Sequence, residues 1–226
     1  MNELLRRLLK GDTLMVSRDY SFREEIWHSC IHGIGILLSV SALSILCVYA
    51  GESGDGTKIA SAIVFGLSLI ILYSASTLYH AIFMPRTKSI LQNIDHGAIY
   101  ILIAGTYTPI SLLGIKGALG WTLFGIAWAI AALGASLNLF FPKRFARSSL
   151  VLYIAMGWMV VGVFKTLLAH LDTLTLSLLV AGGITYTVGI IFYVWRRLHL
   201  NHAIWHFFVL AGSVFHFFMV LLLILA

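Results

Sequence analysis

The amino-acid sequence predicts an all-α integral membrane protein, a bundle of seven transmembrane helices. The 226 residues are 60% hydrophobic and only 11% charged, which is typical of chains that fold in lipid. Apolar runs of about 18 residues or more, long enough to span the hydrocarbon core of a bilayer, recur along the chain from residue 26. The chain therefore divides into an N-terminal tail, residues 1–25, and one transmembrane domain, residues 26–226.

The first three predicted helices are separated by polar turns. Residues 26–50 follow the charged tail and end at a glycine-rich turn, because glycine readily ends a helix. Residues 57–82 form the second helix, which ends before Pro85 and its basic neighbours. The third helix is expected at 94–114, with a kink at Pro109, whose ring interrupts the backbone hydrogen bonds.

The last four helices follow the same pattern. The fourth, residues 117–140, ends before Pro142 and a group of basic residues. The remaining three are predicted at residues 147–169, 174–196 and 203–225. The turns between them are short, so the sequence leaves no room for a soluble domain within the transmembrane part.

The basic residues favour one orientation in the membrane. Of the 15 Lys and Arg residues, 12 lie in the N-terminal tail and in the second, fourth and sixth turns, against two in the other turns. By the positive-inside rule the N-terminus is cytoplasmic and the C-terminus external. The net charge of +6 follows from this topology, so we expect membrane lipids and not nucleic acid as partners.

This topology brings polar residues from four helices to one depth. Each of them lies near the cytoplasmic end of its helix, and ionisable groups within a membrane usually serve a function. They are His28 and His32 in the first helix, Ser76 and His80 in the second, Asp95 and His96 in the third, and His202 and His206 in the seventh.

The histidines have the spacing of a metal site. His202 and His206 are four residues apart, so on a helix their imidazoles face the same way with a rise of about 6 Å. A catalytic zinc ion has three protein ligands and an open position for water. His80, His202 and His206 meet that count. His28 and His32 form a second pair with the same spacing and are rival ligands.

Asp95 has no Lys or Arg in its predicted helix to neutralise it. An unpaired carboxylate at that depth is costly, and either ligating the metal or holding a water on it would remove the cost. Simpler explanations exist for other residues. His28 and His96, taken singly, fit histidines that reach to the interface. His216 lies about 15 Å deeper than His206, so a buried hydrogen bond is expected for it.

The order and spacing of these motifs resemble a known family. The motifs are Glu25-x2-His28-x3-His32, Ser76-x3-His80, Asp95 in the helix that carries residues 104–109, and His202-x3-His206. Together they are similar to the hemolysin III branch of the progestin and adipoQ receptor family, over about residues 24–218. The resemblance implies a seven-helix bundle with a cytoplasmic N-terminus, in the inner membrane of a bacterium.

The resemblance also implies a site. It implies a zinc ion with three histidine ligands, His80, His202 and His206. The aspartate and serine at the places of Asp95 and Ser76 act around the water on that zinc in the receptor branch. One departure stands out, because the first motif usually has Asn where this chain has His28. This departure leaves His28 open as an additional or alternative ligand.

The function expected from these residues is a zinc-dependent intramembrane hydrolase of a lipid amide, similar to the ceramidase activity attributed to relatives. Zinc polarises a carbonyl and lowers the pKa of its water. Asp95 would act as the general base and then protonate the leaving amine. An apolar space between the helices would hold the acyl chain.

Two other classes of function stay open. In the first, the protein is a non-catalytic sensor or membrane-homeostasis protein with structural zinc, and His28, His32 or Asp95 completes a set of four protein ligands. In the second, it is a haemolytic pore. Pores are lined by polar side chains, whereas these helices are apolar except near one end.

Overall fold

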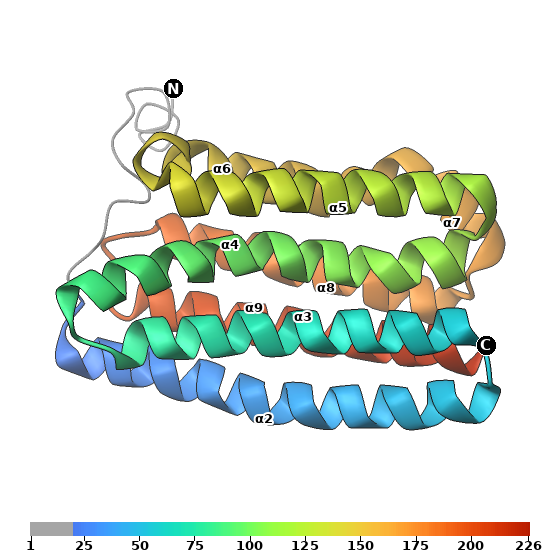
Figure 1. Cartoon of the computed structure of the whole chain (residues 1–226), viewed down its shortest axis with the longest axis horizontal. Coiled ribbons are helices and arrows are strands. Elements are labelled where there is room, and N and C mark those ends of the chain that lie inside the picture. Colours follow the sequence, from blue (N-terminus) through green and yellow to red (C-terminus); the bar gives the residue numbers. More distant parts are fainter. Residues whose placement is uncertain (1–19) are drawn as a thin grey trace.

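A computed structural model of the protein describes residues 20–226, except for the side chains of residues 143, 144, 146 and 147; most of the predicted tail lies outside it. The described helices lie side by side with nearly parallel axes (Figure 1). Seven of the helical spans in residues 20–226 are long and apolar enough to cross a membrane, and this part of the chain contains no strand. The predicted seven-helix bundle is confirmed.

The first two helices begin at side-chain caps. Helix α2, Phe22–Ser53, starts four residues before the predicted boundary because Ser21 and Glu24 form a capping box. Helix α3, Gly56–Ala81, follows Asp55, whose carboxylate accepts the backbone N–H groups of Thr57 at 2.7 Å and Lys58 at 3.3 Å. These two hydrogen bonds lower the pKa of Asp55, so the cap stays ionised at neutral pH.

The third transmembrane helix differs most from the prediction. Helix α4, Pro85–Pro109, begins nine residues before residue 94, so the predicted start of this helix is wrong. Pro85 occupies the first turn, where its fixed φ and missing N–H favour a helix start, so the basic residues that follow it are helical. At Pro109 the α-helix ends and continues as a π-helical turn, η1, Ile110–Ile115.

The fifth predicted span is interrupted. It consists of α6, Pro142–Gly157, a 3₁₀ turn η2, Met159–Val163, and a short helix α7, Phe164–His170. The other spans are regular helices. They are α5, Gly117–Phe140, α8, Thr173–Val194, and α9, Asn201–Leu225. The hydroxyl and backbone N–H of Thr175 lower the pKa of Asp172, the cap of α8.

Helix α4 lies at the centre of the bundle. In its span, 78% of the most apolar window is buried, compared with 22% for α8. Helices α3 and α4 approach closely at Gly105, where an added methyl group would overlap the side chain of Ser68. This close approach brings the last turns of α3, which carry Ser76 and His80, beside the first turns of α4, which carry Asp95.

Candidate metal centre

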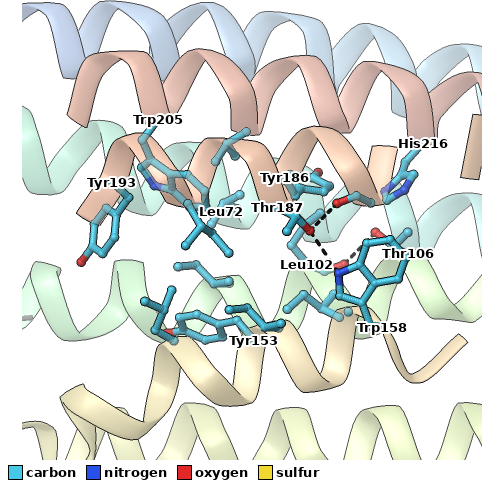
Figure 2. Close-up of a pocket in the computed structure, with 18 of the residues that line it drawn as sticks. Leu72, Leu102, Thr106, Tyr153, Trp158, Tyr186, Thr187, Tyr193, Trp205 and His216 are labelled. Atoms are coloured by element: carbon cyan, nitrogen blue, oxygen red, sulfur yellow. Dashed lines mark hydrogen bonds between the residues drawn. The ribbon is translucent and has the colours of Figure 1, made fainter. Parts of the chain in front are cut away.

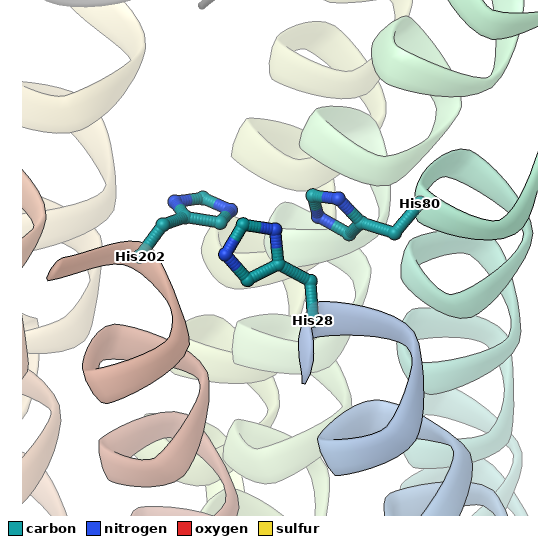
Figure 3. Close-up of side chains that lie close together, drawn as sticks. All are labelled: His28, His80 and His202. Atoms are coloured by element: carbon teal, nitrogen blue, oxygen red, sulfur yellow. The ribbon is translucent and has the colours of Figure 1, made fainter. Parts of the chain in front are cut away.

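Three histidines from three helices point toward one another at one end of the bundle (Figure 3). His28 lies on α2, His80 on α3 and His202 on α9. Each offers a ring nitrogen, and these nitrogens all lie within 4.8 Å of one another. His28 and His80 are buried and His202 is half-buried. The three imidazoles surround a position that a metal ion could occupy.

The two remaining candidate histidines adjoin this group. The Nε2 atoms of His202 and His206 are 3.0 Å apart, in line with the shared helix face that the spacing of four residues predicts. The ring of His206 also stacks on that of His32, with 3.7 Å between centroids and 10° between planes. The structure therefore gathers all five histidines that the sequence offers as metal ligands, from α2, α3 and α9.

The ring nitrogens of these histidines are suited to bind metal. Both nitrogens of His28 and of His32, and Nε2 of His80, are buried without a hydrogen-bond partner among residues 20–226. A buried polar atom without a partner costs free energy, so these nitrogens need a bound ion or molecule as their partner. Neutral imidazole nitrogens carry lone pairs that suit zinc. The donor set therefore fits the zinc ion that the family resemblance implies.

A cavity of about 190 Å³ adjoins the histidines. At one end it is lined by His32, His202 and His206 together with Ser76 and Asp95. Asp95 is 8% exposed, and the Ser76 hydroxyl is buried without a hydrogen-bond partner among residues 20–226. The catalytic candidates and three of the candidate ligands thus share one space.

The rest of the cavity is mainly apolar (Figure 2). Leu72 and Leu102 line its middle, and Trp205 lines it beside His206. Farther along, the indole N–H of Trp158 donates to the hydroxyl of Thr187 at 3.0 Å, which links the end of α6 to α8. His216 lines this part and lies about 15 Å from His206 along α9. The cavity has the composition expected for an acyl chain.

Two other histidines lie outside the cluster. His216 is buried, and its Nε2 lies 3.3 Å from the carbonyl oxygen of Leu179, which confirms the expected buried hydrogen bond. His96 lines the cavity beside Asp95, and its backbone carbonyl accepts the Tyr153 hydroxyl at 2.8 Å. Neither histidine belongs to the group of His28, His80 and His202 that could hold a metal ion, and His32 and His206 lie outside that group as well.

Comparison with known proteins places the chain in a family. Residues 20–217 match the family model described as haemolysin-III related. The chain belongs to the haemolysin-III family. It is 46% identical to Hemolysin-3 of Bacillus cereus over 203 residues, which is 90% of this chain and 93% of that protein. It is 48% identical to the Hemolysin-3 homolog of Bacillus subtilis strain 168, over 89% of this chain and 95% of that protein.

The relatives and the helices agree on location. Both relatives are bacterial, and the aligned region covers nearly the whole length of each. With seven spans that are long and apolar enough to cross a bilayer, this haemolysin-III protein is a multi-pass bacterial membrane protein. The expected resemblance to the hemolysin III branch is confirmed.

Two residues that contact the histidines, Glu25 and Tyr20, are not among the site residues predicted from the sequence. Glu25 is 3% exposed, and its Oε2 lies 2.6 Å from Nδ1 of His80. Its other oxygen, Oε1, lies 2.8 Å from Nζ of Lys88. A usable signal is the spacing of Glu25 three residues before His28 and seven before His32, which places all three on one face of a helix.

An aromatic residue covers the cluster next to the start of α2. The ring of Tyr20 lies 4.7 Å from that of His28 and stacks at 5.0 Å on that of His202. Tyr20 immediately precedes the capping box, which fixes where the chain enters α2. Residue 20 falls in the predicted tail, and an aromatic residue just before a helix cap is a weak signal for a site.

Proposed function

We propose that this haemolysin-III protein is a zinc-dependent intramembrane hydrolase of a lipid amide, with a ceramidase-like reaction. The observation that carries the proposal is the shared cavity, in which candidate metal ligands and Asp95 meet a long apolar lining. Such a site suits a substrate with one reactive polar group and one acyl chain. A purely structural metal site has no need of an adjoining apolar cavity.

The ligands would come from the four histidines whose rings converge. The family resemblance implies His80, His202 and His206, and the close approach of the last two supports that choice. Zinc bound there supplies a Lewis acid that polarises the amide carbonyl and lowers the pKa of a water molecule. His28 is close enough to serve as an additional ligand.

Ser76 would orient the attacking water molecule, and Asp95 would transfer its proton. Ser76 orients the attacking water, and the Asp95 carboxylate accepts a proton from it. The water oxygen then forms a bond to the carbonyl carbon, and the bond from carbon to nitrogen breaks. Asp95 returns the proton to the leaving amine, so the products are a fatty acid and an amine.

The apolar lining would position the acyl chain and exclude bulk water. Leu72 and Leu102 lie beyond the polar end of the cavity, where a chain attached to the reacting carbonyl would run. Exclusion of water strengthens each electrostatic interaction in the site, because the local dielectric constant is low. The lining would also hold the acyl chain, and with it the carbonyl, in a fixed position relative to Asp95.

A membrane sensor with structural zinc is the second candidate. His28 is the observation in its favour, because with His80, His202 and His206 it makes four imidazoles, enough to fill a tetrahedral zinc site. The number of protein ligands decides between the two. X-ray absorption of the zinc-loaded protein would give three nitrogen ligands and one oxygen for the hydrolase, and four nitrogen ligands for the sensor.

The names of the two relatives suggest the third candidate, a haemolytic pore. The cavity found in residues 20–226 weighs against it, because its lining is mainly apolar and pores are lined by polar side chains. Lysis of red cells by the purified protein, measured for the wild type and for His206→Ala, tests this function independently of hydrolysis.

Asp95→Asn tests the proposed hydrolase. The amide has nearly the same size as the carboxylate but cannot accept the proton, so we expect zinc to stay bound and hydrolysis to be lost. Elemental analysis gives the zinc content, and release of fatty acid from a short-chain ceramide in detergent gives the turnover. Asp55→Asn is the matched control, because Asn also caps a helix and residue 55 starts α3 at the opposite end of the bundle.

The outcomes separate the roles of Asp95. Loss of zinc from Asp95→Asn would make Asp95 a ligand. Unchanged turnover would remove it from the mechanism. If the wild type itself hydrolyses none of several lipid amides, the sensor replaces the hydrolase.

A further inference from the structure

A buried carboxylate on α2 connects the histidines to a lysine on α4. Glu25 Oε2 lies 2.6 Å from Nδ1 of His80 and 3.8 Å from Nδ1 of His28. Glu25 Oε1 pairs with the Lys88 ammonium at 2.8 Å. The carboxylate is almost fully enclosed, since Glu25 is only 3% exposed. Burial of a charged group in this way is costly unless each of its oxygens has a partner.

We infer that Glu25 is the positioning residue of the metal centre, and that Lys88 holds Glu25 in place. The inference rests on the proposed metal site and not on hydrolysis. A chain of contacts runs from Lys88 through Glu25 to His80, and only His80 would touch the ion.

The direction of the hydrogen bond fixes the form of His80. An ionised carboxylate can only accept, so at 2.6 Å the proton is on Nδ1 of His80. A neutral imidazole with its proton on Nδ1 carries the lone pair on Nε2. Nε2 of His80 is the nitrogen that has no partner among the described residues. Glu25 thus leaves His80 in the tautomer whose free nitrogen can bind metal.

Lys88 supplies the opposite charge and fixes the geometry. Its ammonium has three donors, and three acceptors surround it: Glu25, the Tyr79 carbonyl at 2.9 Å and the Ile82 carbonyl at 3.5 Å. These carbonyls lie at the C-terminal end of α3, in the turn next to His80, where a cation is favoured. Lys88 therefore joins α4 to the end of α3 and to α2.

The pairing with Lys88 also keeps Glu25 from binding the ion itself. A free carboxylate beside a zinc ion is a competent ligand and could displace an imidazole. Because one oxygen is held by Lys88 and the other by His80, Glu25 is left to polarise and orient the histidine. Removal of such a partner from a metal ligand typically costs about 10- to 100-fold in metal affinity.

The test uses the full-length protein in detergent and measures zinc affinity by competition with a chelator. Glu25→Gln is expected to weaken zinc binding by about 10-fold or more. Glu24→Gln is the matched control, because Glu24 bonds to Ser21 at the helix start. Lys88→Gln is expected to weaken zinc binding as well, whereas Arg86→Gln, two residues earlier in α4 and exposed, should not.

A second readout does not depend on zinc. In protein labelled with ¹⁵N-histidine, the His80 signals, assigned with His80→Gln, should show a proton on Nδ1 in the metal-free wild type. Glu25→Leu, which can accept no hydrogen bond, should lose this preference. Melting temperatures show whether each variant is folded.

Three results would overturn the inference. They are wild-type zinc affinity in folded Glu25→Gln, an equal loss of affinity in Glu24→Gln, and an unchanged His80 tautomer in Glu25→Leu. A wild type that binds no zinc would refute the proposed metal site, and a wild type that binds zinc but hydrolyses nothing would refute only the hydrolase.

Discussion

Two groups of buried polar side chains in this bundle differ in how their hydrogen bonds are satisfied. In the histidine cluster, both ring nitrogens of His28 and of His32 have no partner within residues 20–226. In the middle of the bundle, the Tyr73 hydroxyl lies 2.7 Å from Ser213 Oγ, and the Tyr186 hydroxyl lies 2.8 Å from the same atom. The second group satisfies itself and ties three helices together. Buried groups that need an external partner mark the candidate site more clearly than burial itself does.

The largest expected difference between the two groups is in zinc content. We expect about one zinc per chain in the wild type, and almost none in His206→Ala, which loses a ligand implied by the resemblance. His216→Ala removes a histidine of the same helix that makes its own hydrogen bond, so it should keep its zinc. Elemental analysis of the purified proteins measures all three. Equal zinc in the wild type and His206→Ala would refute this choice of ligand.

A topology reporter tests which compartment each end of the bundle faces. The histidine cluster lies near the start of α2 and α9, whereas the C-terminus lies at the other end (Figure 1). From the distribution of Lys and Arg we expect the C-terminus outside the cytoplasm. Alkaline phosphatase fused after Ala226 should then be active, and a fluorescent protein that folds only in the cytoplasm should stay dark. The reverse pattern would place the histidine cluster at the external face.

The smallest effect is expected in the hydrogen-bonded group of Tyr73, Tyr186 and Ser213. Tyr73→Phe removes the hydroxyl but keeps the ring that packs against His32 at 5.0 Å. An interhelical hydrogen bond within a membrane contributes about 0.6 to 1.7 kcal/mol to the free energy of unfolding. We expect a loss of that size in reversible unfolding by detergent, with unchanged zinc content. A drop in zinc would show that the two groups are coupled.

Much of the candidate site is predictable from the sequence, because histidines stand out in an apolar chain. His202 and His206 share a helix face through their spacing, and His80 ends an apolar segment. The number of spans follows from their length and composition. Tertiary packing sets which nitrogens meet across α2, α3 and α9. From the sequence alone, His28 and His32 therefore stay rivals to His80.

Glu25 opens the first family motif, but composition gives neither Glu25 nor Lys88 a role in the site. Glu25 adjoins Glu24 at the edge of a charged tail, where a solvated face is the ordinary explanation. Lys88 falls in a turn if the third helix starts at residue 94, but α4 begins at Pro85 and includes it. The break at η2 is equally hard to predict, since no proline lies between residues 143 and 226.

The candidate centre closes the chain on itself. His206 Nδ1 lies 3.4 Å from the carbonyl oxygen of His28, although the two residues are 178 positions apart. At a synthesis rate of about 5–20 residues per second, roughly 10 to 35 s separate the emergence of these residues from the ribosome. During that time, α2 and α3 present their histidines without the partners on α9. A chain that ends before α9 lacks His202 and His206, so a full complement of imidazoles exists only in a completely synthesised bundle.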